Sequence, residues 1–198
     1  MARVPFVGLT GGLGAGKSTA LAALERLGAA TLSTDAVVHE LYAGPELRDA
    51  VVARWGEAVA PDGVVDRNAI AERVFASAVE REWLEGEIWP RVGARVTSWL
   101  DEMKAREPPP PAAVVETPLL FEAGMDAIYD ATIAVVADED VRAARAGKRG
   151  HTYAGERASR HLPQEEKSQR ATFTVDNTGS IEDLEAQLSS VLATLGAP

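Results

Sequence analysis

The 198-residue sequence contains no cysteine, which excludes disulfide bonds and thiolate metal sites. No apolar run approaches the roughly 18 residues that a membrane-spanning helix needs. The first residues, Met1–Pro5, show no apolar signal-peptide core and lead directly into a strand-like segment. These absences predict a soluble cytoplasmic protein that does not associate with membranes.

Positive charge is also scarce, since 20 lysines and arginines face 30 aspartates and glutamates, for a formal net charge of −10. Proteins that bind nucleic acids carry an excess of Lys and Arg for the phosphate backbone, so no nucleic-acid partner is expected. An anionic ligand must then be bound where positive charge is concentrated locally. One region of this kind runs from Arg142 to Arg170 and is rich in arginine and lysine.

Short apolar runs alternate with helical patterns over much of the chain. Leucines at helical spacing predict a helix from Lys17 to Leu27 with its stop at Gly28, and an apolar stripe over 181–195 predicts a last helix with Ser180 as N-cap. This alternation predicts a doubly wound α/β fold with a five-stranded, mostly parallel sheet. The predicted buried strands are Val4–Leu9, Ala30–Leu32, Ala113–Val115, Thr132–Val136 and Thr172–Val175.

The loop Gly11–Ser18 reads G-G-L-G-A-G-K-S and satisfies the pattern G-x-x-x-x-G-K-[ST]. Glycines let the backbone turn its N–H groups inward to form a nest for phosphate oxygens, and Lys17 adds a positive charge at the β- and γ-phosphates. The Ser18 hydroxyl is a ligand for Mg²⁺, and the following helix directs its positive end at the same anions. Since a buried strand precedes the loop and an amphipathic helix follows it, the sequence predicts binding of a nucleoside triphosphate.

Other features narrow the class of nucleotide-binding protein. The segment 175–178 does not match the N-K-x-D guanine reader of GTPases, and no L-S-G-G-Q stretch of an ABC ATPase is present. The stretch 35–111 has helical patterns, expected over 68–75 and 80–105, and ends in the stiff run Pro108–Pro111. We therefore predict a nucleotide-binding core of 1–34 and 112–198, a helical acceptor-binding subdomain of 35–111 and a short lid of 142–165. Small-molecule kinases have this layout.

Several segments together resemble the dephospho-CoA kinase family. The resemblance starts with Gly8–Thr19 and continues through Asp62-Gly63 with Asp66-Arg67, Val74-Phe75 and Pro118–Glu122, which reads P-L-L-F-E. It extends to Arg145 and Arg149 in the predicted lid and to Asp176-Asn177 with Gly179, so it is collinear over nearly the whole chain. Membership implies a P-loop kinase fold and transfer of the ATP γ-phosphoryl group to the ribose 3′-hydroxyl of dephospho-CoA, with Mg²⁺.

The resemblance also implies a set of site residues. Catalytic roles fall to Lys17, Asp35 and Arg145, and Ser18 is the metal ligand. ATP binding is expected of Gly12, Gly14, Ala15, Gly16, Lys17, Ser18, Thr19, Arg149 and Asn177. Binding of the acceptor substrate is expected of Thr10, Asp35, Pro118, Leu119, Leu120, Phe121 and Glu122.

Local physical chemistry leaves alternatives to several of these roles. Asp35 is either the base for the acceptor hydroxyl or the N-cap of a helix over 36–41. Arg145 and Arg149 either neutralise phosphate charge or form a solvated helix face. Leu119, Leu120 and Phe121 are equally suited to a core, and Glu122 to a helix cap. Asn177 with Gly179 either contacts adenine or turns the chain into the last helix, while the buried-strand carboxylate Glu116 needs a partner of undetermined kind.

The sequence departs from the family pattern at three places. Ser33-Thr34-Asp35 retains the second acid of a D-A-D segment, Trp89-Pro90 replaces His-Pro, and His161 stands where a lid-side helix carries glutamine after Arg157. None of the three histidines, His39, His151 and His161, shows metal-ligand spacing. A different small-molecule kinase and a nucleotide-binding regulatory protein that has lost catalysis are the alternative functions.

Overall fold

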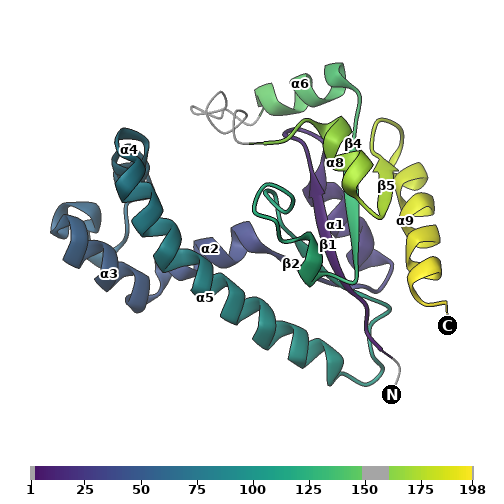
Figure 1. Cartoon of the computed structure of the whole chain (residues 1–198), viewed down its shortest axis with the longest axis horizontal. Coiled ribbons are helices and arrows are strands. Elements are labelled where there is room, and N and C mark those ends of the chain that lie inside the picture. The colour runs from purple at the N-terminus through teal and green to yellow at the C-terminus, as the bar shows by residue number, and fades with distance from the viewer. Residues whose placement is uncertain (1–2, 149–160, 198) are drawn as a thin grey trace. The chain divides into compact units, whose positions relative to one another are not determined.

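A computed structural model describes residues 3–148 and 161–197 of the chain. Its five-stranded sheet has the order β2-β3-β1-β4-β5, and all four strand pairs are parallel (Figure 1). The strands are β1 (Phe6–Gly11), β2 (Ala30–Ser33), β3 (Ala113–Glu116), β4 (Ala131–Val136) and β5 (Phe173–Asp176). Each lies within two residues of its predicted run, so the predicted five-stranded parallel α/β fold is confirmed.

Successive side chains of β1 point to opposite faces of the sheet and so lie in two different layers. Val7 and Leu9 are fully buried in a core with helices α1 (Lys17–Arg26) and α9 (Ile181–Leu195). Gly8 and Thr10 face the other layer, where a Cβ at Gly8 would collide with Leu120 and Thr10 contacts helix α8 (Gln164–Arg170). The middle strand therefore brings its carboxyl end, and the loop after it, into contact with both layers.

The ends of the core helices follow the sequence signals. Helix α1 ends at Arg26, and Gly28 adopts a φ of 90° just beyond the C-cap Leu27. In α9 the Ser180 hydroxyl accepts from the Asp183 N–H, and the Asp183 carboxylate accepts from the Ser180 N–H, which forms a capping box. Helix α6 (Glu139–Lys148) and the short turn η3 (Asp126–Ile128) complete the described elements of the core.

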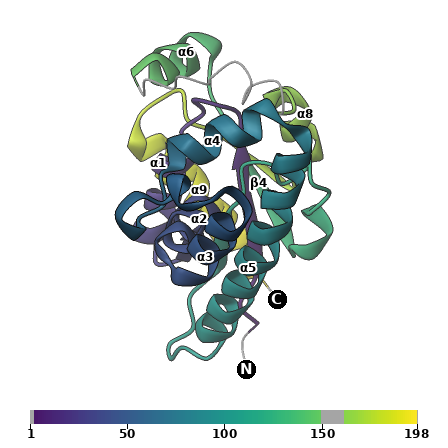
Figure 2. The ribbon, with the colours of Figure 1, turned by 90° about the vertical axis from the view of Figure 1, so that its left-hand side faces the viewer.

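The chain divides into two compact units, one of Met1–Ser33 with Leu100–Pro198 and one of Thr34–Trp99. The second unit holds helices α2 (Thr34–Ala43), α3 (Pro45–Trp55) and α4 (Arg67–Ala76), the turns η1 (Glu57–Val59) and η2 (Pro61–Gly63), and most of α5 (Ala78–Lys104). Figure 2 shows these helices, and α2 packs against α3. None of the described helices is long and apolar enough to cross a membrane.

A separate apolar core explains why the second unit folds compactly. Its buried members come from α3, η1, α4, α5 and the residues on either side of η2. The Trp55 and Trp83 rings meet edge to face with centroids 4.9 Å apart. Glu80 accepts hydrogen bonds from both Trp55 and Arg54, which ties α5 to α3. Asp66 caps α4 by accepting from the N–H groups of Asn68 and Ala69. In the Asp66-Arg67 pair, Asp66 is thus the N-cap of α4 and Arg67 is its first residue.

Replacing Ser180 by Ala removes the capping box of α9. We expect the free energy of unfolding to fall by about 1 kcal/mol, because the Asp183 N–H loses its acceptor. Ser190→Ala, in the middle of the same helix, is the matched control and should change stability by less than about 0.5 kcal/mol. Urea denaturation followed by circular dichroism measures both; equal losses in the two variants would contradict the capping role.

Candidate active site

The loop Gly11–Ser18, named the phosphate loop here, links the middle strand β1 to helix α1. Gly14 and Gly16 adopt φ values of 76° and 89°, a region that residues with a Cβ rarely enter. The N–H groups of Thr19 and Ala20 bond back to the Gly16 carbonyl and begin the helix. The loop thus has the geometry of an anion nest at a helix N-terminus.

Asn177 supports the phosphate loop from behind. Its side chain is 2% exposed, and its Nδ2 donates to the Ala15 carbonyl oxygen over 2.8 Å. A Cβ at Gly16 would collide with the same amide nitrogen, so this position has no room for a side chain. The bond fixes the position of the Ala15 carbonyl within the loop. Asn177 therefore shapes the loop and does not merely turn the chain into α9.

Lys17 and Ser18 are the last residues of this loop and the first of α1. The Lys17 ammonium donates to the carbonyl oxygens of Gly11 and Gly12 over 3.1 and 3.2 Å. Ser18 is exposed in the first turn of α1. The described residues include no group of three or more His, Cys, Asp or Glu side chains that could hold a metal ion. A hydroxyl ligand beside a phosphate nest fits Mg²⁺ delivered with a nucleotide, because Mg²⁺ is commonly held by few protein oxygens together with phosphates.

Helix α6 places two arginines, Arg142 and Arg145, against the phosphate loop. Arg145 donates to the Asn177 carbonyl oxygen over 3.0 Å, and the Arg142 backbone carbonyl packs so closely on Gly14 that a Cβ there would collide with it. Arg145 is therefore partly buried against the loop support and does not belong to a solvated helix face. Arg149, His151 and Arg157 lie outside the described residues, as does half of the predicted lid, residues 149–160.

The segment Pro118–Glu122 follows β3 at the same edge of the sheet. Pro118 and Leu119 are partly exposed, whereas Leu120 and Phe121 are buried at 0% and 3% exposure. The Thr10 hydroxyl, one residue before the phosphate loop, donates to the Pro118 carbonyl oxygen over 3.2 Å. The structure thus connects two predicted acceptor-binding residues directly, and it places the two large apolar side chains of the segment in the interior.

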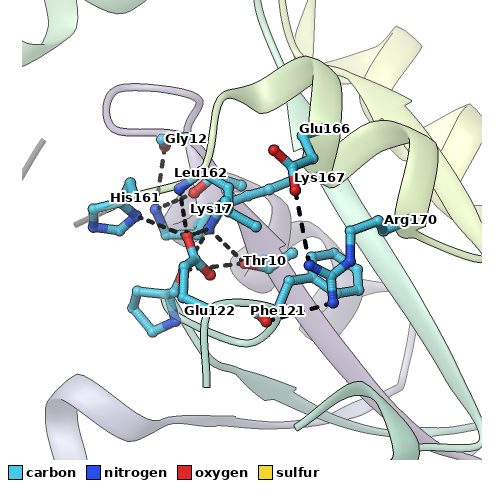
Figure 3. Close-up of polar contacts among 12 residues, drawn as sticks. Thr10, Gly12, Lys17, Phe121, Glu122, His161, Leu162, Glu166, Lys167 and Arg170 are labelled. Carbon is cyan, nitrogen blue, oxygen red and sulfur yellow. Dashed lines mark hydrogen bonds and ion pairs between the residues drawn. The ribbon is translucent and has the colours of Figure 1, made fainter. Parts of the chain in front are cut away.

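Glu122 pairs with a residue that sequence reasoning missed, the fully buried Lys167 of α8 (Figure 3). Their charged groups lie 2.8 Å apart, and Glu122 also accepts from the Leu162 N–H over 2.8 Å. Burial raises the pKa of Glu122, but the hydrogen bonds from Lys167 and Leu162 outweigh it, and the net pKa lies below its usual value. Burial also lowers the pKa of Lys167, against the opposing effect of Glu122. Glu122 forms this ion pair and caps no described helix.

Two further carboxylates stand near strand ends. Asp35 lies within the first turn of α2, which begins at Thr34, so the alternative that Asp35 is the N-cap of a helix over 36–41 is wrong. Glu116, 8% exposed, ends β3 and is in register with Leu9 of β1 and Ser33 of β2. Both carboxylates therefore stand at, or just beyond, the carboxyl ends of parallel strands, where ligands of open α/β sheets bind.

Comparison with known proteins identifies the family. The family model described as dephospho-CoA kinase matches residues 5–183. A dephospho-CoA kinase of Moorella thermoacetica is 39% identical over 95% of this chain and 89% of its own length. The chain belongs to the dephospho-CoA kinase family.

Solved structures show which fold the chain shares. A Thermus thermophilus structure shares 34% identity over 98% of this chain and 99% of its own, with a TM-score of 0.79. A dephospho-CoA kinase from Campylobacter jejuni shares the fold, with a TM-score of 0.69, 23% identity, and coverage of 96% of each chain. The predicted family and P-loop kinase fold are confirmed, and membership makes this chain an ATP-dependent kinase.

Asn177→Asp should weaken nucleotide binding, because a carboxylate oxygen would face the Ala15 carbonyl oxygen where an N–H now donates. We expect the Kd for ADP to rise about tenfold or more, the cost of an unsatisfied buried acceptor. Asn68→Asp, an exposed position of α4, makes the same chemical change and should leave the Kd within about twofold. Calorimetric titration on folded protein measures both, and an unchanged Kd in Asn177→Asp would contradict the supporting role.

Proposed function

We propose that the chain transfers the γ-phosphoryl group of MgATP to the ribose 3′-hydroxyl of dephospho-CoA, giving CoA and ADP. The observation that carries the proposal is the shaped phosphate loop in a chain of this family, with a P-L-L-F-E segment bonded to Thr10 beside that loop. In the reaction the acceptor oxygen forms a bond to the γ-phosphorus as the bond to the β–γ bridging oxygen breaks, and ADP leaves. We expect this to take place in the cytoplasm.

On the donor side, the N–H groups of the loop and the Lys17 ammonium bind the β- and γ-phosphate oxygens. Arg145, anchored on the Asn177 carbonyl, supplies positive charge next to the loop. Ser18 is the residue that would hold Mg²⁺, which when bound neutralises charge on the β- and γ-phosphates. Electrostatic stabilisation and positioning of this kind are the main contributions that a protein makes to phosphoryl transfer.

On the acceptor side, Asp35 takes the proton from the attacking hydroxyl and orients that oxygen in line. Its support is its place in the first turn of α2, directly after the carboxyl end of β2, together with the family resemblance at Ser33-Thr34-Asp35. Pro118 and Leu119 are partly exposed and available to substrate, whereas the partly exposed Glu122 is paired with Lys167. Acceptor binding by the helical region 35–111 is part of the same proposal.

Incubation with MgATP and dephospho-CoA should yield CoA, detected by mass. Absence of product at saturating substrates would overturn the proposed reaction. A parallel panel of nucleosides and sugars then reveals whether another small-molecule kinase activity is present, and no product with any acceptor would indicate a regulatory nucleotide-binding protein.

Asp35→Asn tests the base. We expect kcat to fall by about a hundredfold or more while the Kd for ATP is unchanged, because the substitution removes proton acceptance and keeps the side-chain volume. Lys17→Ala should instead weaken ATP binding, since it removes the charge at the phosphates. A variant Asp35→Asn with normal kcat and a lowered melting temperature would contradict the catalytic assignment and leave Asp35 as a helix-end residue.

A further inference from the structure

Among the residues that the structure describes, Lys167 has the largest fully buried side chain, and this side chain bears an ammonium group. Its Nζ donates to the Pro118 carbonyl oxygen over 2.7 Å and to the Thr10 hydroxyl over 3.4 Å, and it pairs with Glu122 at 2.8 Å. An ammonium has three N–H donors, and three partners surround it. The group is therefore fully coordinated by protein atoms and is not available as a ligand for phosphate.

The three partners belong to two functional segments. Thr10 is the last residue before the phosphate loop, whereas Pro118 and Glu122 are the first and last residues of the P-L-L-F-E segment. One ammonium group thus holds both ends of that segment and attaches it to the end of β1. Figure 3 shows the contacts of Lys167 with Glu122 and Thr10.

Helix α8 contacts the same segment at further points. The Leu162 N–H, just before α8, donates to Glu122, and Arg170 donates to the Phe121 carbonyl oxygen over 3.5 Å. The Arg170 guanidinium also lies 4.7 Å from the centroid of the Phe121 ring. Segment 118–122 is therefore held along its length by α8, and Lys167 makes the central contact.

Stability alone gives a weak reason for such a pair. Burying two charges costs desolvation energy, and apolar residues of similar volume are often as stable or more so. A hydrogen-bonded ion pair does, however, fix the relative position of the two segments that it joins, because its hydrogen bonds allow the two charged groups little displacement. A fixed geometry matters at this place, since small errors in the position of reacting groups reduce phosphoryl transfer strongly.

We propose that Lys167 and Glu122 act as one positioning unit, which sets the acceptor-side segment Pro118–Glu122 at a fixed distance from the phosphate loop. Neither residue touches the reacting atoms in this assignment. The unit acts through Thr10 and Pro118, and its contribution to the acceptor rests on the reaction proposed above.

The kinetic test uses Lys167→Met, Glu122→Gln and the double variant in the full chain. We expect kcat/KM for dephospho-CoA to fall about tenfold or more in each single variant, with the Kd for ADP within about twofold of the wild type. The double variant should lose no more than the worse single variant, because residues that act as a unit are non-additive. Glu25→Gln, at an exposed position near the end of α1 and outside the region 35–111, is the matched control for Glu122→Gln and should behave as the wild type.

Two kinetic outcomes would overturn the proposal. One is a kcat/KM for dephospho-CoA equal to that of the wild type in both single variants. The other is an equal loss of ADP affinity and of kcat/KM together with a lowered melting temperature, which a merely structural pair would give. Because Lys167→Met leaves a buried carboxylate without its partner and can fail to fold, Glu122→Gln and the charge-free double variant carry the test in that case.

Hydrogen exchange tests the positioning without turnover. The N–H groups of Ala123, Gly124 and Met125 bond to the carbonyl oxygens of Leu119, Phe121 and Leu120, so their exchange reports on the segment. We expect faster exchange there in Glu122→Gln and in the double variant, with unchanged exchange in α9; equal rates in the segment would overturn the positioning role. If exchange changes while the wild type makes no CoA, the proposed reaction fails and the positioning role stands.

Discussion

A buried positive charge joins three parts of the core at the carboxyl edge of the sheet. Lys167 binds the end of β1, the start of the P-L-L-F-E segment and the carboxylate that ends it. Burying an ammonium group without partners would cost desolvation free energy. The buried Lys167 therefore depends on Glu122 and on its polar partners. The arrangement gives the end of β1, which leads into the phosphate loop, and segment 118–122 one shared point of attachment.

The phosphate loop needs a second support, since a nest of inward N–H groups leaves carbonyl oxygens that must be bonded elsewhere. Asn177 provides this for Ala15, and the Lys17 ammonium bonds the Gly11 and Gly12 carbonyls. Arg145 in turn bonds the Asn177 carbonyl oxygen. The loop is therefore held by groups from β5–α9 and α6, far away in the sequence, as well as by its own glycines.

Periodicity and loop chemistry were sufficient to predict the strands, the Ser180 cap and the phosphate loop, because each depends on residues close together in the sequence. The family resemblance added the acceptor. Lys167 was missed because its neighbours in α8 are polar and nothing in the sequence marks that one turn as buried. For Glu122 and Asn177 the sequence left alternatives open, since their partners, Lys167 and the Ala15 carbonyl, are brought near them only by folding. The N-cap alternative for Asp35 failed because α2 begins at Thr34, two residues before the expected helix start at 36, so Asp35 lies inside the helix.

The central claim is that this sheet edge directs the γ-phosphoryl group to one oxygen of the acceptor. Phosphorus NMR of the product formed from MgATP and dephospho-CoA tests it most directly. The account predicts a new phosphomonoester signal that couples to the ribose 3′ proton, formed in equal amount with ADP. A phosphate on the 2′-oxygen or on the pantetheine arm, or release of inorganic phosphate alone, would contradict it.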